Sequence, residues 1–170
     1  MADAPRPLDD LLLYRISRLL AVAGGMVIRL CEGRFGITRR EWRLVAMLAS
    51  RGPLGSSQLA ECAQLDRGRT SKAVGSLVAK GVVSRSQPGG DKRHVLLQLT
   101  PKGEALYAEL YPLVSAINAE LMGALDRGEG AQLDRSLKRL QERADALAAA
   151  ADLPKADRRR RGTVVAAARD

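Results

Sequence analysis

Apolar residues recur at helical spacing over most of the chain, interrupted after the middle by two strand-like runs. Spacings of three and four residues run through 8–33 and return after residue 100. The segments 82–85 and 94–99 are instead rich in residues that favour strands. The pattern predicts a mainly α fold with a small β-hairpin. The expected helices cover 8–33, 38–52, 56–63, 66–80, 101–125 and 133–147.

Two helix starts carry local signals. Thr38 and Glu41 can form a capping box, in which each side chain accepts a hydrogen bond from the backbone N–H of the other. Thr100 followed by Pro101 is typical of a helix that begins with a threonine cap. These signals place helix starts on both sides of the strand-like region.

The helices around residue 65 form a predicted helix-turn-helix. Ser56 or Ser57 is expected to cap the first of them, and Asp66 the second, through side-chain oxygens. Leu65 is the expected apolar plug of the turn, and Gly81 is the expected end of the second helix. The residues expected in the core are Leu59, Cys62, Ala63, Thr70, Ala73, Val74, Leu77 and Val78.

The outer face of the second helix is small, polar and basic. No acidic residue interrupts it, as expected of a helix that enters a DNA major groove. Each glycine inside a helix costs about 1 kcal/mol relative to alanine, so two glycines make this helix soft. The residues of this face are Gly68, Ser71, Lys72, Gly75 and Ala79, with Arg69 and Ser76 at its edges.

The hairpin tip carries Lys92 and Arg93 after two glycines. Glycine allows the positive φ angles of a tight turn, and a slim basic tip can enter a minor groove. A helix-turn-helix followed by a basic β-hairpin predicts a winged helix.

This stretch resembles the MarR family of bacterial transcriptional regulators. The match rests on residues 66–72, on LVAKGVVSR at 77–85, and on the Asp-Lys-Arg at 91–93 followed by LTPKG at 99–103. The resemblance implies a two-lobed dimer that binds DNA, and it favours an ion pair of Asp91 that orients Arg93. The residues we expect at the DNA are Ser57, Arg67, Arg69, Thr70, Ser71, Lys72, Ser76, Lys92 and Arg93.

Basic charge is concentrated on the predicted DNA-binding module. The net charge is +9, and residues 38–100 contain eleven Lys or Arg against four Asp or Glu. The run Arg158–Arg161 lies in a basic tail, where it either stays solvated or contacts phosphates. Charge gathered on one module is expected of a protein whose partner is a polyanion.

The terminal helices carry apolar stripes with too few partners inside one chain. A symmetric homodimer would cover them. We expect a flexible arm at 1–7, a helical dimerisation region at 8–33 and 101–150, a winged helix at 34–100, and a basic disordered tail at 151–170. The stripe residues are Leu12, Ile16, Leu19, Leu20, Ala23, Val27 and Leu30, then Leu133, Leu137, Leu140, Ala144 and Leu147.

Composition narrows the remaining classes of function. No apolar run is long enough to span a membrane, and two cysteines are too few for a disulfide framework, so we expect a reducing cytoplasm. No catalytic constellation is recognisable, and His94 has no second ligand at metal spacing, so neither metal nor cofactor is expected.

Cys31 is either a core residue or an oxidant sensor activated by Arg29 and Arg34.

Arginines on the first helix indicate an effector site. Arg15 and Arg18 lie in a helix whose segment 11–31 contains no acid, so either could hold a carboxylate. Members of the MarR family commonly bind small aromatic acids or phenols, and Trp42, Tyr14 and Tyr107 could form the walls. The alternative is that these residues are solvated or ordinary packing partners.

The sequence therefore predicts a dimeric winged-helix regulator that binds a palindromic DNA site. A repressor released by a small aromatic carboxylate or phenol is the first interpretation. A non-specific, nucleoid-type DNA-binding protein and a protein-interaction module remain alternatives.

Overall fold

A computed structural model describes residues 7–87, 95–152 and 154 of the 170-residue chain. The chain divides into two compact units, Met1–Gly123 and Ala124–Asp170. The fold is mainly α with one small sheet, as the sequence predicts. The elements of the first unit are η1 (Leu8–Asp10, a 3-10 turn), α1 (Leu12–Arg34), α2 (Arg39–Arg51), β1 (Leu54–Gly55), α3 (Ser56–Cys62), α4 (Arg67–Ala79), β2 (Val83–Ser86), β3 (Leu96–Leu99) and α5 (Pro101–Met122). The second unit contains α6 (Arg127–Ala150).

The predicted caps at Thr38 and Thr100 are confirmed. The Glu41 amide donates to Thr38 Oγ1 at 3.1 Å, and the Thr38 amide donates to Glu41 Oε2 at 2.6 Å. The Gly103 amide donates to Thr100 Oγ1 at 3.1 Å at the start of α5. Both helices flanking the helix-turn-helix therefore begin where their side chains indicate.

Two predicted boundaries are wrong. The first helix is broken by the extended residue Leu11, so that η1 precedes α1. Neither Ser56 nor Ser57 caps α3, because the chain enters this helix from a paired strand that ends at Gly55. Gly55 is the N-cap residue, and its amide donates to Gln58 Oε1 at 2.9 Å.

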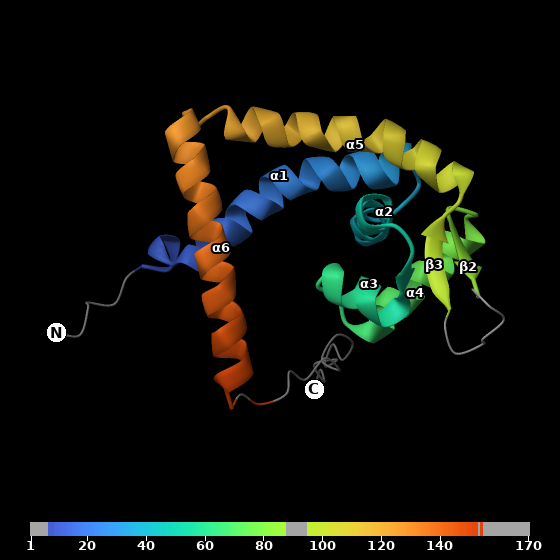
Figure 1. Ribbon diagram of the computed structural model, residues 1–170. Helices are drawn as coiled ribbons and strands as arrows, with labels where there is room; N and C mark the ends of the chain where they lie inside the picture. The colour runs from blue at the N-terminus through green and yellow to red at the C-terminus, as the bar shows by residue number, and fades with distance from the viewer. Residues whose placement is uncertain (1–6, 88–94, 153, 155–170) are drawn as a thin grey trace, which may run out of the picture. The chain divides into compact units, whose positions relative to one another are not determined.

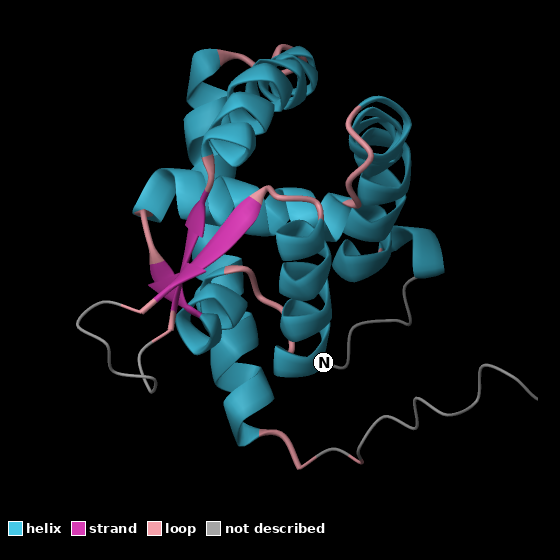
Figure 2. Ribbon diagram, turned by 90° about the vertical axis from the view of Figure 1, so that its right-hand side faces the viewer, coloured by secondary structure: helices cyan, strands magenta, loops and turns pink. Residues whose placement is uncertain are grey.

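The sheet has three antiparallel strands in the order β1-β3-β2. β3 pairs with β2 from Val83↔Leu99 to Ser86↔Leu96, and with β1 through Leu54↔Leu97. The hairpin strands were predicted, whereas β1 was not, because two residues are too short to show an alternation. The sheet lies at the edge of the helical domain (Figure 2).

The winged helix has a dense aliphatic core. α2, α3, α4 and the sheet supply most of it, while Cys31 of α1 and Leu110 of α5 close it from the other side. The most buried residues of the winged helix are Ile37, Leu44, Val45, Leu48, Leu59, Ala63, Val74, Leu77, Val82, Val83 and Leu97.

The helices α1 and α5 run side by side along the first unit (Figure 1). α1 continues through Gly24 and Gly25 without interruption. Gly24 is buried, and a Cβ atom built on it would lie 2.8 Å from the guanidinium of Arg39. Glycine at this position thus leaves room for the Arg39 side chain of α2.

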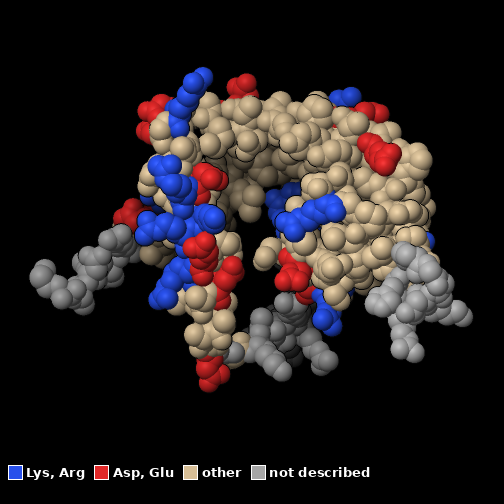
Figure 3. Space-filling model, viewed as in Figure 1, with Lys and Arg blue, Asp and Glu red and all other residues tan. Residues whose placement is uncertain are grey.

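α6 has its own amphipathic pattern. Asp126 and Glu129 form a capping box at its start, a signal present in the sequence that the prediction missed. Basic and acidic side chains alternate over the face of α6 visible in Figure 3. The leucines of its predicted seam are exposed on this unit, from 38% at Leu133 to 52% at Leu147. Within the described parts of the chain, no helix combines the length and apolarity needed to cross a membrane.

Candidate nucleic-acid interface

The start of α4 is organised by Asp66. Its carboxylate accepts the Arg69 amide at 2.8 Å, as predicted for an N-cap, and lies 3.1 Å from Arg69 Nε. A negative charge at this position also suits the positive end of the helix dipole. The Arg69 side chain is 53% exposed, so it is accessible from solvent although it is paired with Asp66.

The outer face of α4 is exposed and carries no acid. Thr70, Ala73, Val74 and Leu77 hold the opposite face in the core. A Cβ atom added to Gly75 would have no neighbour within 4 Å, so the protein's own packing does not require glycine there. The exposed residues are Arg67, Gly68, Arg69, Ser71, Lys72, Gly75 and Ala79.

Two members of the expected DNA-contact set are wrong. Thr70 is fully buried, and its hydroxyl donates to the Asp66 carbonyl at 3.0 Å. Ser76 is half-buried, and its hydroxyl is hydrogen-bonded to the buried carboxylate of Glu41. The burial of Thr70 agrees with its helical spacing, which also places it in the expected core, whereas the contact of Ser76 with Glu41 was not predicted.

The other expected contacts lie on exposed positions or outside the described residues. Ser57 is exposed in the first turn of α3, beside the helix-turn-helix. The wing-tip residues Asp91, Lys92, Arg93 and His94 lie outside the described residues, as does the basic run 158–161. Their contributions stay predictions.

The motif 99–103 closes the junction between the end of α4 and the start of α5. Lys102 Nζ donates to the Lys80 carbonyl at 2.8 Å, and Thr100 Oγ1 donates to the Gly81 carbonyl at 2.6 Å. A Cβ atom on Gly103 would lie 2.2 Å from the Val82 carbonyl oxygen. Sequence reasoning used this motif for the resemblance but did not see that it fastens α4 to α5.

The expected effector residues are not brought together in one chain. Arg15 and Arg18 are exposed, and Arg18 has an acidic partner, Asp9, with its carboxylate 3.4 Å away in η1. An exposed arginine keeps its water, so the expected cost of leaving it unpaired does not arise. Thirteen residues separate Arg18 from the core residue Cys31, which is about 20 Å along a helix.

Trp42 is also unsuited to the expected role. It is 8% exposed, and its ring stacks on Tyr107 with centroids 5.7 Å apart. Tyr107 lines a cavity of about 470 Å³ that includes Glu104 and no basic residue. Tyr14 is half-buried on α1. These aromatic residues pack within the protein and do not frame a site for an anion.

A more suitable cavity lies between α1 and α5. It has a volume of about 520 Å³, and Arg29 is the basic residue among its lining side chains. Cavities of this size accept small ligands, and apolar walls with one charged group can orient an aromatic acid. The other lining residues are Met26, Leu30, Leu113, Ala116 and Ile117.

Cys31 is not placed as an activated thiol. Cys31 is fully buried, and burial, reinforced by the charge of Glu32, raises the pKa of its thiol. The expected activation by Arg29 and Arg34 is therefore wrong. Cys62 is half-buried, not core, with Arg51 Nη1 3.2 Å from its sulfur. Within the described ranges, no group of three or more His, Cys, Asp or Glu side chains could hold a metal ion.

The fold and the exposed face of α4 define a winged helix-turn-helix protein. In a comparison with known protein families, the model of the MarR family matches residues 35–94. A transcriptional regulator of Neisseria gonorrhoeae, FarR, is 38% identical over 74 residues, which are 44% of this chain and 51% of that protein. The repressor NicR of Pseudomonas putida is 29% identical over 55% of this chain and 59% of its own length. The chain thus spans only about half to three fifths of these relatives.

The same fold is found in a solved MarR/EmrR-family regulator from Acinetobacter sp. ADP1. It superposes with a TM-score of 0.76 at 23% identity, over 83% of this chain and 99% of that one. Residues 35–94, which contain the helix-turn-helix, thus match the MarR family, and the fold of the chain is that of solved members of this family.

Replacing Lys72 with alanine is expected to lower the preference for a specific DNA site. Lys72 is exposed on the acid-free face of α4, and loss of a base contact costs about 1–3 kcal/mol. Competition between a specific duplex and random DNA measures this preference. Lys138→Ala, an equal loss of charge on α6, should leave the ratio unchanged. An unaltered ratio in Lys72→Ala would show that this position reads no base.

Proposed function

We propose that the protein is a homodimeric transcriptional regulator that represses its target until a small anionic effector releases it from DNA. The observation that carries the proposal is the exposed face of α4, which combines Arg67, Arg69 and Lys72 with small residues and lacks any acid. The match of residues 35–94 to the MarR family supports the same function.

The distribution of exposed apolar side chains supports a homodimer. Among the described residues, every large hydrophobic side chain that is strongly exposed lies outside the winged helix, in 8–28 or 111–147. Figure 3 shows a mostly uncharged surface over α5. Apolar patches of this kind mark interfaces. A two-fold dimer would place two α4 helices on half-sites about 10 bp apart, or a multiple of that, in a palindromic site.

Repression and effector release are the finer part of the proposal. NicR, a relative over part of the chain, is a repressor. The cavity between α1 and α5 offers apolar walls and the guanidinium of Arg29, which suit a small aromatic acid. An effector bound there can weaken DNA binding only by its different affinity for the two states of the protein.

A gel-shift titration on the DNA upstream of the protein's own gene tests this function. A panel of aromatic acids and phenols is added, and an active effector is expected to reduce DNA affinity about 5- to 150-fold. Arg29→Ala should retain DNA binding and lose the response, whereas the control Arg18→Ala should respond as the wild type does. A response lost in Arg18→Ala and kept in Arg29→Ala would place the effector elsewhere.

A non-specific, nucleoid-type DNA-binding protein is the second candidate. Gly68 and Gly75 occupy exposed positions of α4 from which longer side chains could read bases. Such a protein would bind unrelated sequences with similar affinity and with a steep dependence on salt.

A further inference from the structure

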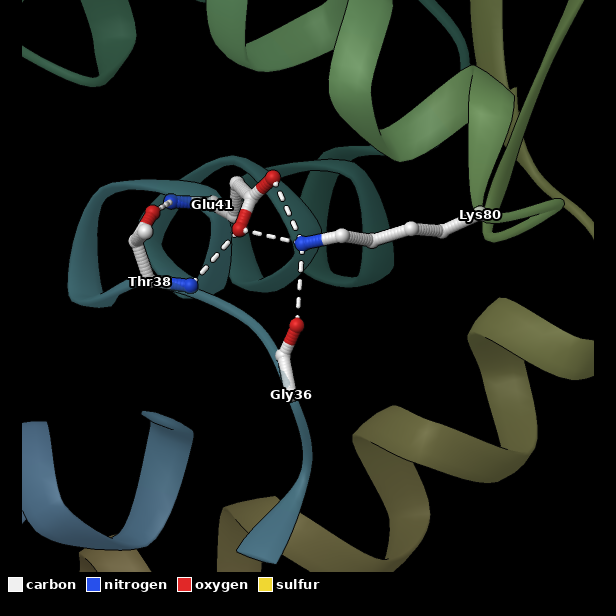
Figure 4. A network of polar contacts seen from close by, with 4 residues as sticks. All are labelled: Gly36, Thr38, Glu41 and Lys80. Atoms are coloured by element: carbon white, nitrogen blue, oxygen red, sulfur yellow. Dashed lines mark hydrogen bonds and ion pairs between the residues drawn. The ribbon is translucent and has the colours of Figure 1, made fainter. Parts of the chain in front are cut away.

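A buried carboxylate of α2 links α4 to the rest of the winged helix. Glu41 belongs to α2, and its side chain is 4% exposed. Lys80, the C-cap residue of α4, places its Nζ atom 3.0 Å from both carboxylate oxygens of Glu41 (Figure 4). The hydroxyl of Ser76, also on α4, hydrogen-bonds the same carboxylate. Two residues of the last turns of α4 are thus held by one acid.

The ammonium group of Lys80 is fully paired. Besides the two bonds to Glu41, Nζ donates to the Gly36 carbonyl at 2.9 Å, in the segment that joins α1 to α2. A lysine ammonium has three N–H donors, so none remains for a phosphate. The Lys80 ammonium group therefore binds other groups of the protein, although it lies in the basic DNA-binding module.

The ionised form of Glu41 is the stable one in this environment. Burial acts to raise the pKa of the carboxyl group, but the hydrogen bonds from Ser76, Thr38 and Lys80 and the charge of Lys80 outweigh it. The net result is a pKa below the ordinary value. A paired, ionised carboxylate holds its partners in one geometry, because a displaced partner would leave a buried charge uncompensated.

The same end of α4 is tied to α5. The Lys80 carbonyl accepts a hydrogen bond from Lys102, and the Gly81 carbonyl accepts one from Thr100. The end of α1, the start of α2 and the start of α5 therefore meet at Lys80 and Gly81. A change in the position of any of these helices would therefore displace the C-terminal end of α4.

We propose that Glu41 and Lys80 are positioning residues, which set the orientation of α4 toward DNA without contacting a base or a phosphate. This inference rests on the proposed DNA-binding function. Lys80 and Gly81 belong to the sequence motif 77–85. Basic charge alone does not explain this pair of residues, whereas a role in positioning α4 does.

Substitutions that remove one charge can distinguish a positioning role of Glu41 and Lys80 from a purely electrostatic effect on DNA affinity. Glu41→Gln makes the protein more basic, so electrostatics predicts tighter DNA binding, whereas loss of positioning predicts weaker binding. We expect Glu41→Gln and Lys80→Met each to weaken specific binding about 3- to 30-fold, the range of coupling through packed networks. The double variant should be no weaker than the single variants, since the two residues act as one unit.

The salt dependence tests whether Lys80 touches DNA. The slope of log K against log salt should be unchanged in Lys80→Met, whereas loss of a phosphate contact would reduce it by about one. Glu61→Gln on α3 and Lys138→Met on α6 are exposed, charge-matched controls. We expect neither control to weaken binding as Glu41→Gln does. Tighter binding by Glu41→Gln, or a reduced slope in Lys80→Met, would overturn the inference.

Hydrogen exchange in the absence of DNA gives an independent readout. Amides of 76–82 should exchange faster in Glu41→Gln and in Lys80→Met, while those of α3 and the middle of α5 keep their wild-type protection. Uniform loss of protection would mean a general structural role and would overturn the inference. If the wild type showed no preference for any DNA site, the proposed function would fail, whereas the exchange result would still decide whether the pair holds α4.

Discussion

Gly103→Ala is expected to destabilise the protein by about 1–3 kcal/mol or more, because the new methyl group would overlap backbone. A Cβ atom at this position would lie 2.2 Å from the Val82 carbonyl oxygen, a distance that real structures do not tolerate. That carbonyl also accepts the Thr100 amide at 3.1 Å, so it cannot move aside without breaking the junction of β2 and α5. Urea unfolding followed by circular dichroism measures the change in the free energy of unfolding.

Gly75→Ala is the matched control for this substitution. Gly75 also lies inside a helix, but a Cβ atom there meets nothing within 4 Å. Alanine is favoured over glycine in a helix, so this variant should be more stable by about 1 kcal/mol. A Gly103→Ala protein as stable as the wild type would show that the close approach of α5 to Val82 is not part of the fold.

A triple substitution of Leu133, Leu137 and Leu140 to glutamine is expected to dissociate the proposed homodimer. These leucines form an exposed seam on α6, and each buried leucine contributes about 1.5–3 kcal/mol. A monomer engages only one half-site and loses the gain from simultaneous binding. DNA affinity should therefore fall by about 100-fold or more. Analytical ultracentrifugation and gel shift measure the two effects.

The opposite face of α6 provides the control for the seam. Arg135, Lys138 and Glu142 are exposed and lie roughly half a turn away from the leucines. Changing all three to glutamine should leave both the dimer and the DNA affinity close to wild type. A wild type that sediments as a monomer at micromolar concentration would contradict the dimer and the palindromic site together.

Local signals in the sequence predicted the frame of the winged helix. The caps at Thr38, Asp66 and Thr100 act within three residues, so chain spacing is enough to recognise them. The buried face of α4 follows from its helical period. β1 was not predicted because it has only two residues, and its partner strand β3 begins more than forty residues later in the chain.

The predictions that sequence could not make depend on contacts between residues far apart in the chain. Ser76 has helical neighbours that suggest an exposed edge, yet its partner Glu41 lies 35 positions earlier in the chain. The separation of the expected effector residues within one chain was missed for a related reason. Arg15 and Arg18 share a helix with Arg29, but only the tertiary packing shows that Arg29 faces a cavity and that Arg18 meets Asp9.

The proposed function requires that α4 reads DNA sequence, and a comparison of two binding affinities tests this. The affinity of the full-length protein for the DNA upstream of its own gene is compared with its affinity for random duplex DNA at one fixed salt concentration. We expect specific binding to be at least about 1,000-fold tighter, as is usual for regulators. Equal affinity for both DNAs would contradict it and would favour the non-specific DNA-binding protein.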